Sequence, residues 1–198
     1  LAGTDIKLTL ELGGKGANII FEDAAIDQSV EGIVNAIFFN QGHGCCAGSR
    51  LFVQESVADL VIDKLTQRMN SLMVGDPLDK NTDIGAINSS KQLQTINEYI
   101  KIGLQEGGEI YQPKCNLPKK GNWCAPTLFL NVSQSHRIVQ EEIFGPGLAV
   151  QTFRTIDEVI EKANNTPFGL SAGVWTEKGS KIFYLTQKLN AGVVWANT

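Results

Sequence analysis

The segment from Phe38 to Arg50, FFNQGHGCCAGSR, places the thiols of Cys45 and Cys46 in a glycine-rich stretch between a helix-like and a strand-like segment. A cysteine attacks a carbonyl carbon when its sulfur is exposed, the approach is open and nearby groups stabilise the thiolate. Glycines keep the approach open, and the backbone N–H groups of such a loop can stabilise an oxyanion. His43 and Arg50 could also stabilise the thiolate if they fold back onto it. The segment therefore predicts a nucleophilic cysteine.

Three other interpretations of the cysteine pair are open. Free cysteine is often a small buried apolar residue, although three glycines within residues 42–48 do not suit a core helix or strand. A zinc site is disfavoured because the chain has no CxxC motif and only two histidines, His43 and His136. A cysteine hydrolase needs a histidine base oriented by an acid, and His43 lies too close to Cys45 in a tight loop. We therefore expect no metal site.

Glu11 is the second candidate, within LTLELGGKGANIIF at residues 8–21. It interrupts an alternating apolar segment and is followed by Gly13 and Gly14. A carboxylate at the end of a strand, beside a glycine turn, can act as a general base, and its two leucine neighbours suggest partial desolvation. Taken alone, the segment favours the alternative of a polar residue on the open face of a half-buried strand. GGKG lacks the spacing of a Walker loop and the third glycine of a dinucleotide fingerprint.

Strand-like and helix-like segments alternate along the whole chain. Asp27 and Thr155 are expected to cap two of the helices. The alternation favours an α/β fold, with a mostly parallel twisted sheet and flanking helices. We expect Glu11 and Cys45 near the carboxyl ends of strands, where functional groups of such sheets gather. Strands are predicted near residues 6–12, 17–21, 50–54, 107–113, 125–132, 148–153, 170–176 and 191–197, and helices near 27–40, 56–73, 90–104, 155–165 and 179–190.

Composition limits the classes of partner and compartment. The 198 residues suit one domain, and a net charge of −4 gives no reason to expect nucleic acid or a membrane surface as a partner. No apolar run reaches the length of a membrane span. Four cysteines do not make a disulfide scaffold, so a reducing compartment such as the cytoplasm is expected. Because the chain begins at Leu1 and ends in a strand-like segment, we expect it to be a piece of a longer protein.

Together, LELGGK and FFNQGHGCCAGSR resemble the glutamate and cysteine motifs of the aldehyde dehydrogenase superfamily. Glu11 precedes Cys45 by 34 residues, which is the spacing of that family. QEEIFGP, at residues 140–146, resembles the family's cofactor-contact motif, and the segments 164–176 and 189–197 match its downstream pattern. Three motifs in the right order, within a likeness that covers essentially the whole chain, make the resemblance specific.

The resemblance implies a role for five side chains. Cys45 corresponds to the nucleophile and Glu11 to the base that activates water. Glu142 corresponds to the residue that holds the nicotinamide ribose hydroxyls, and Phe144 to the aromatic residue packed near the nicotinamide. Gln92 matches a position that contacts the cofactor in many members. No role is implied for Cys115 and Cys124, which we interpret as structural.

The resemblance also implies an activity, which is the NAD- or NADP-dependent oxidation of a small aldehyde to a carboxylic acid through a cysteine thiohemiacetal and thioester. A glutamate at position 11 favours hydrolysis of the thioester over transfer to coenzyme A. Residues 1–198 would be the catalytic domain. The cofactor-binding domain, the oxyanion-hole asparagine and the oligomerisation segments would lie outside this chain. The chain alone should then be inactive, and the full-length protein a homo-oligomer.

Four positions depart from the family pattern. His43 replaces the usual Gln or Glu, Gly44 directly precedes the cysteine, Gly16 follows GGK, and Gly147 replaces a β-branched residue. These glycines are expected to loosen the site, which keeps open the alternative of a non-catalytic scaffold domain. SVEGIV and VQESV also resemble the family-16 branch, in which certain animal members lack the cysteine.

Overall fold

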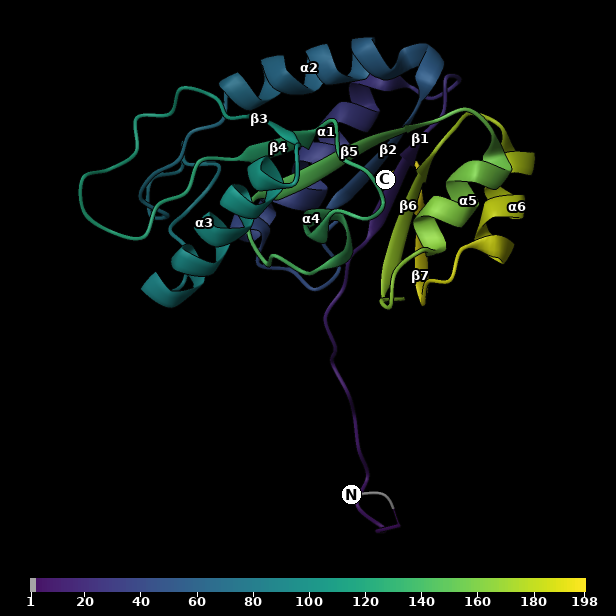
Figure 1. Ribbon diagram of the computed structural model, residues 1–198, viewed down its shortest axis with the longest axis horizontal. Helices are drawn as coiled ribbons and strands as arrows, with labels where there is room; N and C mark the ends of the chain where they lie inside the picture. Colours follow the sequence, from purple (N-terminus) through teal and green to yellow (C-terminus); the bar gives the residue numbers. More distant parts are fainter. Residues whose placement is uncertain (1–2) are drawn as a thin grey trace.

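A seven-stranded sheet forms the centre of the computed structural model, which describes residues 3–198 (Figure 1). The strand order is β3-β4-β5-β2-β1-β6-β7. Neighbouring strands run parallel except β3 and β4, which are antiparallel. The predicted α/β fold with a mostly parallel sheet is confirmed. The strands are β1 (Ala17–Ile20), β2 (Arg50–Gln54), β3 (Glu109–Tyr111), β4 (Thr127–Leu130), β5 (Gly147–Phe153), β6 (Ser171–Trp175) and β7 (Val193–Ala196).

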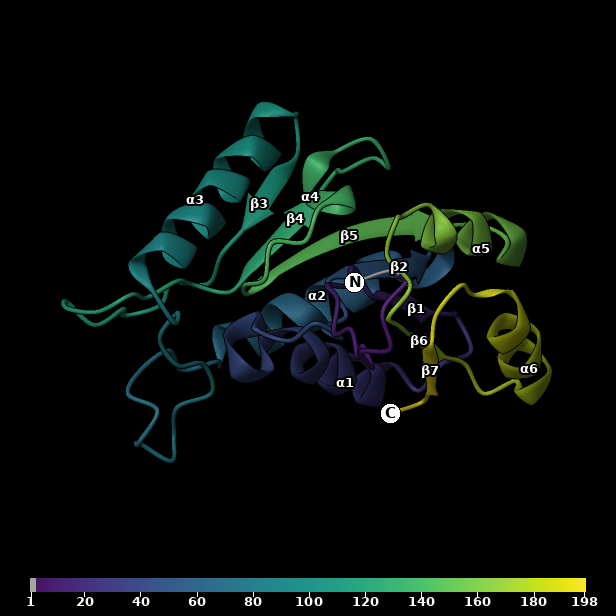
Figure 2. The same cartoon turned by 90° about the horizontal axis from the view of Figure 1, so that it is seen from below.

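The helices lie on both faces of this sheet. Figure 2 shows α1 on one side and α3, α4 and α5 on the other. All five predicted helices are present, and α4 is an additional short helix that sequence periodicity did not reveal. The helices are α1 (Ile26–Phe38), η1 (Phe39–Gly42), η2 (Glu55–Val57), α2 (Ala58–Asn70), α3 (Ser90–Gln105), α4 (Arg137–Gln140), α5 (Ile156–Asn164) and α6 (Gly179–Lys188).

Strand β2 shows how the sheet is buried on both faces. Leu51 and Val53 pack into a cluster that contains the apolar stripes of α1 and α2. Phe52, between them, points to the opposite face and packs with Phe153 and Val159 of α5. Each of these side chains is almost fully buried. Successive side chains of a strand point to opposite faces, so a continuous apolar run is the expected pattern for a sheet covered on both sides.

One of the two predicted helix caps is confirmed, and Ser89 caps another helix without having been predicted as a cap. The Ser89 hydroxyl accepts a hydrogen bond from the backbone N–H of Gln92 at the start of α3, and Thr155 caps α5 through Glu158 in the same way. The prediction that Asp27 caps α1 is wrong. The helix begins one residue earlier, and Asp27 lies in its first turn, where a carboxylate still favours the positive end of the helix dipole.

The strand predicted near residues 6–12 is absent from the sheet. These residues form an extended tail that runs away from the domain (Figure 1). Its apolar side chains are largely exposed, with Leu10 at 62% and Leu12 at 66%. The residue pattern suits a strand, but a strand is stabilised by the ladder of hydrogen bonds to a neighbour. No neighbouring strand pairs with this segment within residues 3–198.

Candidate active site

Cys45 lies at the corner of a tight turn between η1 and β2. The backbone N–H of Ala47 donates to the carbonyl oxygen of Gly44 at 3.1 Å, so Cys45 and Cys46 occupy the two central positions. Cys45 is half-buried and Cys46 is exposed. Within the described part of the chain, the backbone N–H groups of Cys45 and Cys46 donate to no acceptor. The turn therefore offers a thiol beside free N–H donors, which is the arrangement that stabilises an oxyanion.

The residues before this turn have an unusual backbone. Asn40, Gln41 and Gly42 have φ values of 50°, 48° and 75°, three successive residues in the left-handed region. The Asn40 side chain donates to the carbonyl oxygen of His43 at 3.0 Å, which supports the bend. Gly42 packs so closely on Gly145 that a Cβ atom would lie less than 3.0 Å from its backbone. Strain of this kind occurs where surrounding structure fixes the backbone, often at functional sites.

Gly14 joins the glutamate segment to the cysteine turn. A Cβ atom at this position would lie less than 3.0 Å from the carbonyl oxygen of Cys45, so only glycine fits. The Gly14 backbone N–H donates to Oε1 of Glu142 at 3.0 Å. A Cβ atom on Gly13 would lie less than 3.0 Å from the same carboxylate. One short segment, residues 13–14, thus brings the predicted nucleophile and the predicted ribose ligand together.

Glu142, Phe144 and Gln92 form one face of this site. Gln92 Nε2 donates to the carbonyl oxygens of Ile143 and Phe144, at 2.9 Å and 3.0 Å. Phe144 has a φ of 55° and is 37% exposed as a residue, both uncommon for a large apolar residue. A strained, exposed aromatic ring beside a half-buried carboxylate suits a ligand with a flat ring and hydroxyl groups. These residues fit the nicotinamide and ribose of a dinucleotide.

The site lies at the amino ends of the strands, which corrects one expectation. The cysteine turn precedes β2, Gly14 precedes β1 and Glu142 precedes β5. These three strands are adjacent and parallel, so the segments that enter them meet at one edge. The prediction that Glu11 and Cys45 lie near carboxyl ends is wrong, because α1 returns the chain from the carboxyl end of β1 to the amino end of β2.

Glu11 is not in contact with the cysteine turn. Its side chain is exposed on the tail, and it forms no hydrogen bond or ion pair among the described residues. The expected partial desolvation is therefore wrong for this chain, since both leucine neighbours are exposed as well. Glu11 is nevertheless only three residues from Gly14, and three residues of extended chain span roughly 10 Å. A hollow of about 480 Å³ lies beside this part of the tail, lined by Leu10, Leu12, Gly13, Pro167, Phe168, Gly169 and Leu170.

Arg50 does not support the thiolate. Its buried guanidinium donates to the carbonyl oxygens of Lys15, Lys162 and Ala163, at 2.8–3.2 Å. It therefore ties β2 to the segment before β1 and to the end of α5. His43 does not point its acceptor nitrogen at Cys45 either, since Nε2 accepts from the backbone N–H of Asn88. The expected stabilisation of the thiolate by these two side chains is not observed.

Lys15 is the most unusual charged group near the site. It is fully buried, and its Nζ has no hydrogen-bond partner among the described residues. Burial and the neighbouring Arg50 cation lower the pKa of Lys15 to about 7, although the carboxylates of Glu142 and Glu141 oppose the shift. The folded protein therefore carries a buried ammonium at acidic pH, which costs stability.

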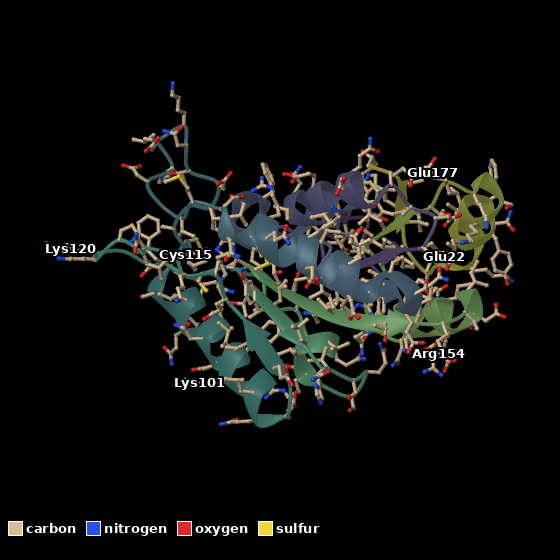
Figure 3. The ribbon with its side chains drawn as sticks, turned by 90° about the horizontal axis from the view of Figure 1, so that it is seen from above. Glu22, Lys101, Cys115, Lys120, Arg154 and Glu177 are labelled. Atoms are coloured by element: carbon tan, nitrogen blue, oxygen red, sulfur yellow. The ribbon has the colours of Figure 1, made fainter. Side chains whose placement is uncertain are left out.

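Lys15→Met is expected to stabilise the fold at pH 6, by roughly 2 kcal/mol or more. Because the folded pKa of Lys15, about 7, lies below its ordinary value of 10.5, the wild-type free energy of unfolding rises between these pH values. The advantage of the variant should therefore be largest below pH 7 and shrink toward pH 10. Urea denaturation at pH 6 and pH 9 measures it, with Lys101→Met, at an exposed position of α3 (Figure 3), as control. An advantage that is equal at both pH values contradicts this account.

The glycine departures do not loosen the site uniformly. A Cβ atom on Gly16 would lie 2.9 Å from the Ala47 carbonyl oxygen, and one on Gly147 would lie 3.1 Å from the Phe129 ring. Both glycines thus lie in closely packed surroundings, so the expected loosening is not seen there. Gly44 differs, because the nearest atoms to its Cβ position are 3.9 Å away. A side chain at position 44 would have room.

The other two cysteines lie outside this site. Cys124 is buried, and burial raises the pKa of its thiol to about 11. Burial also raises the pKa of Cys115, which lies at the base of the loop that carries Lys120 at its tip (Figure 3). A high thiol pKa leaves little reactive thiolate near neutral pH, which fits the structural role predicted for both. Lys119 and Lys120 of this loop are exposed.

Within residues 3–198, no group of three or more His, Cys, Asp or Glu side chains is arranged to hold a metal ion. No helix in this range has the length and apolar character needed to cross a membrane.

Sequence reasoning missed the residues that assemble the site. Gly14 and Gly42 allow the backbone of one segment to pack closely on that of another, and Lys15, next to Gly14 in the chain, has a buried ionisable side chain. The double glycine after Glu11 was a usable signal, because glycine marks close approach as well as turns. Nothing in the sequence distinguishes Lys15 from an exposed lysine.

The chain resembles known proteins over nearly its whole length. The model of the aldehyde dehydrogenase family matches residues 2–198. A mitochondrial aldehyde dehydrogenase of Mesocricetus auratus is 44% identical over 191 residues, which is 96% of this chain and 38% of that protein. The solved NAD-dependent aldehyde dehydrogenase of Sinorhizobium meliloti superposes with a TM-score of 0.92 at 38% identity, covering 95% of this chain and 38% of that one.

A second solved structure, an indole-3-acetaldehyde dehydrogenase in complex with NAD+, gives a TM-score of 0.91 at 41% identity and covers 95% of this chain and 39% of that one. The chain thus spans less than two fifths of the length of the relatives it matches. Within that span, fold and sequence agree with the same family throughout. The chain belongs to the aldehyde dehydrogenase family.

Proposed function

We propose that the protein oxidises a small aldehyde to a carboxylic acid with NAD or NADP, and that residues 1–198 form its catalytic domain. The observation that carries this proposal is the packing of Gly14 against both the Cys45 carbonyl and the Glu142 carboxylate. It brings the nucleophile and the ribose ligand to one edge of the sheet. The relative solved with NAD+ supports the choice of cofactor.

The Cys45 thiolate attacks the aldehyde carbonyl carbon, and the new carbon–sulfur bond gives a thiohemiacetal. The negative charge then moves to the former carbonyl oxygen, where the free backbone N–H of Cys45 or Cys46 can hold it. The position of Cys45 at a turn corner leaves room for the substrate on its exposed side. The apolar hollow beside Leu10 and Phe168 suits the hydrocarbon part of an aldehyde.

Glu142, Phe144 and Gln92 would hold the nicotinamide end of the cofactor. Glu142 offers a carboxylate to the ribose hydroxyls, and Phe144 offers the face of its aromatic ring. Gln92 holds the backbone of Phe144 in place through hydrogen bonds. The nicotinamide ring, when bound, supplies the acceptor for the hydride that leaves the thiohemiacetal carbon. Fixing Phe144 in a strained conformation before binding lowers the cost of ordering it on binding.

Glu11 would remove a proton from the water that hydrolyses the Cys45 thioester, releasing the acid and restoring the thiol. Glu11 is three residues from Gly14, which packs on the cysteine turn, and three residues of extended chain span roughly 10 Å. The exposed alternate leucines of the tail support a domain organisation in which further chain covers this segment. A base at this position favours water over coenzyme A as the acyl acceptor.

The proposal is tested by supplying the full-length protein with a panel of aldehydes and NAD or NADP. Reduced cofactor and carboxylic acid should form in equal amounts. If the protein is folded and binds NAD but oxidises no aldehyde, the result favours a non-catalytic scaffold domain. The departures at His43 and Gly44 would then be the first candidates for the cause of inactivity.

Glu11→Gln is expected to slow steady-state acid release by about 10²–10³-fold while it leaves the first turnover fast. Glutamine keeps the size of the side chain but cannot accept the proton of water. Stopped-flow detection of NADH should therefore show a burst of about one equivalent per site, followed by a slow phase. Unchanged acid release would remove Glu11 from the mechanism.

The remaining parts of the proposal concern the whole protein. The four free thiols support a reducing compartment such as the cytoplasm. We propose a homo-oligomer, on the family resemblance. Its partner is a small aldehyde, and we propose no role for nucleic acid or membranes.

A further inference from the structure

His43 contacts two segments besides its own. Its Nε2 accepts a hydrogen bond from the backbone N–H of Asn88 at 3.3 Å. Its ring stacks on the ring of Phe144, with centroids 5.3 Å apart and planes inclined by 19°. His43 itself is only two residues before Cys45. One imidazole therefore touches the cysteine turn, the segment around Phe144 and the segment that leads into α3.

These contacts close a ring of interactions around the site. Asn88 directly precedes Ser89, the N-cap of α3. Gln92, in the first turn of that helix, holds the carbonyl oxygens of Ile143 and Phe144. Phe144 is then fixed from two sides, with its backbone held by Gln92 and its ring by His43.

We infer that His43 is a positioning residue, which holds the ring of Phe144 and the start of α3 in fixed relation to Cys45, and that it does so only while its imidazole is neutral. The inference rests on the proposed function in one respect, that Phe144 faces the nicotinamide. Its structural part, the bond to Asn88, stands independently of catalysis.

The dependence on protonation follows from the donor and acceptor roles. A neutral imidazole that carries its proton on Nδ1 leaves Nε2 as an acceptor, whereas an imidazolium has no acceptor. Protonation would thus set two N–H groups against each other at the Asn88 contact. Burial lowers the pKa of His43 below its ordinary value, which favours the neutral form. Nδ1 is buried without a partner among the described residues, so no carboxylate supports the charged form.

The ionisable groups on the packed elements do not supply another cause. They are Cys45 on the same loop, Glu141 and Glu142 before Phe144, and Lys91 on α3. None of these charges shifts the pKa of His43, which burial lowers, while the contacts with Asn88 and with the Phe144 backbone oppose that shift. Both carboxylates already accept hydrogen bonds from other groups.

Two variants of the full-length protein separate the contacts. His43→Gln keeps an acceptor for the Asn88 N–H but has no ring and does not titrate, whereas His43→Phe keeps a ring but has no acceptor. Hydrogen exchange of the segment 84–92 is followed at pH 7 and pH 5, each value corrected for intrinsic exchange. Wild-type protection at Asn88 should fall about 3- to 10-fold at pH 5. His43→Gln should lack this fall, and His43→Phe should be poorly protected at both pH values.

Exchange of β2 in the same samples controls for a general loss of stability. Equal protection at Asn88 in all three proteins, or an acid loss that persists in His43→Gln, would overturn the inference. NAD binding is a separate arm. His43→Gln, which lacks the ring, is expected to bind NAD about 3- to 10-fold more weakly than wild type at pH 7. If no form binds NAD, the proposed function fails, and the exchange data still decide the role of His43.

Discussion

Cys45→Ser is expected to lower the rate of NAD(P)H formation from an aldehyde by at least about 10³-fold in the full-length protein. A serine hydroxyl is not ionised near neutral pH, and no base is bonded to position 45 among the described residues that could activate it. The substitution changes one atom, so folding and NAD binding should be retained. Absorbance at 340 nm with saturating aldehyde measures the loss.

The neighbouring thiol provides a matched control. Cys46 occupies the next position of the same turn and is more exposed than Cys45. Cys46→Ser should therefore keep most of the activity. Loss of activity in Cys46→Ser, with activity retained in Cys45→Ser, would show that Cys46 is the nucleophile. The site would then need a different geometry.

Gly14→Ala is expected to lower kcat/KM by about 10²-fold. The added methyl group would collide with the carbonyl oxygen of Cys45, and this contact involves backbone that cannot rotate away. The cysteine turn or the glutamate segment must then move by about an ångström, which misplaces the thiol relative to Glu142. Steady-state kinetics at several aldehyde concentrations measure the change.

Gly44→Ala is the matched control within the same turn. Its added methyl group meets nothing closer than 3.9 Å, and its backbone is not in the left-handed region. Its activity should stay within about twofold of wild type. A large loss in Gly44→Ala, with Gly14→Ala unaffected, would show that turn flexibility rather than close packing controls the thiol.

Much of the fold could be predicted because the periodicities are strong. The apolar runs of β2 and β5 predicted strands, and the cap at Thr155 marked the start of α5. The segment at residues 6–12 failed because alternation describes a residue pattern and not the presence of a neighbouring strand. Helix α4 was missed because four residues are too few for periodicity to register.

The candidate site was predictable in its residues and not in its assembly. Motif likeness pointed to Cys45, Glu11 and Glu142, but the edge of the sheet at which Cys45 and Glu142 meet depends on chain direction through α1, and Glu11 lies on the exposed tail. The close approach of Gly14 to Cys45 is a contact between residues far apart in sequence. No local pattern encodes it, and the same holds for the stacking of His43 on Phe144.

In the proposed mechanism, Cys45 carries the acyl group during turnover. The most direct measurement is mass spectrometry of the full-length Glu11→Gln protein, quenched with acid soon after mixing with aldehyde and NAD and then digested. We expect an acyl adduct on Cys45 that is absent without NAD and absent when Cys45→Ser is combined with Glu11→Gln. Acid formation by the wild-type protein, with no adduct on Cys45 in the trapped variant or with the adduct on Cys46, would contradict this mechanism.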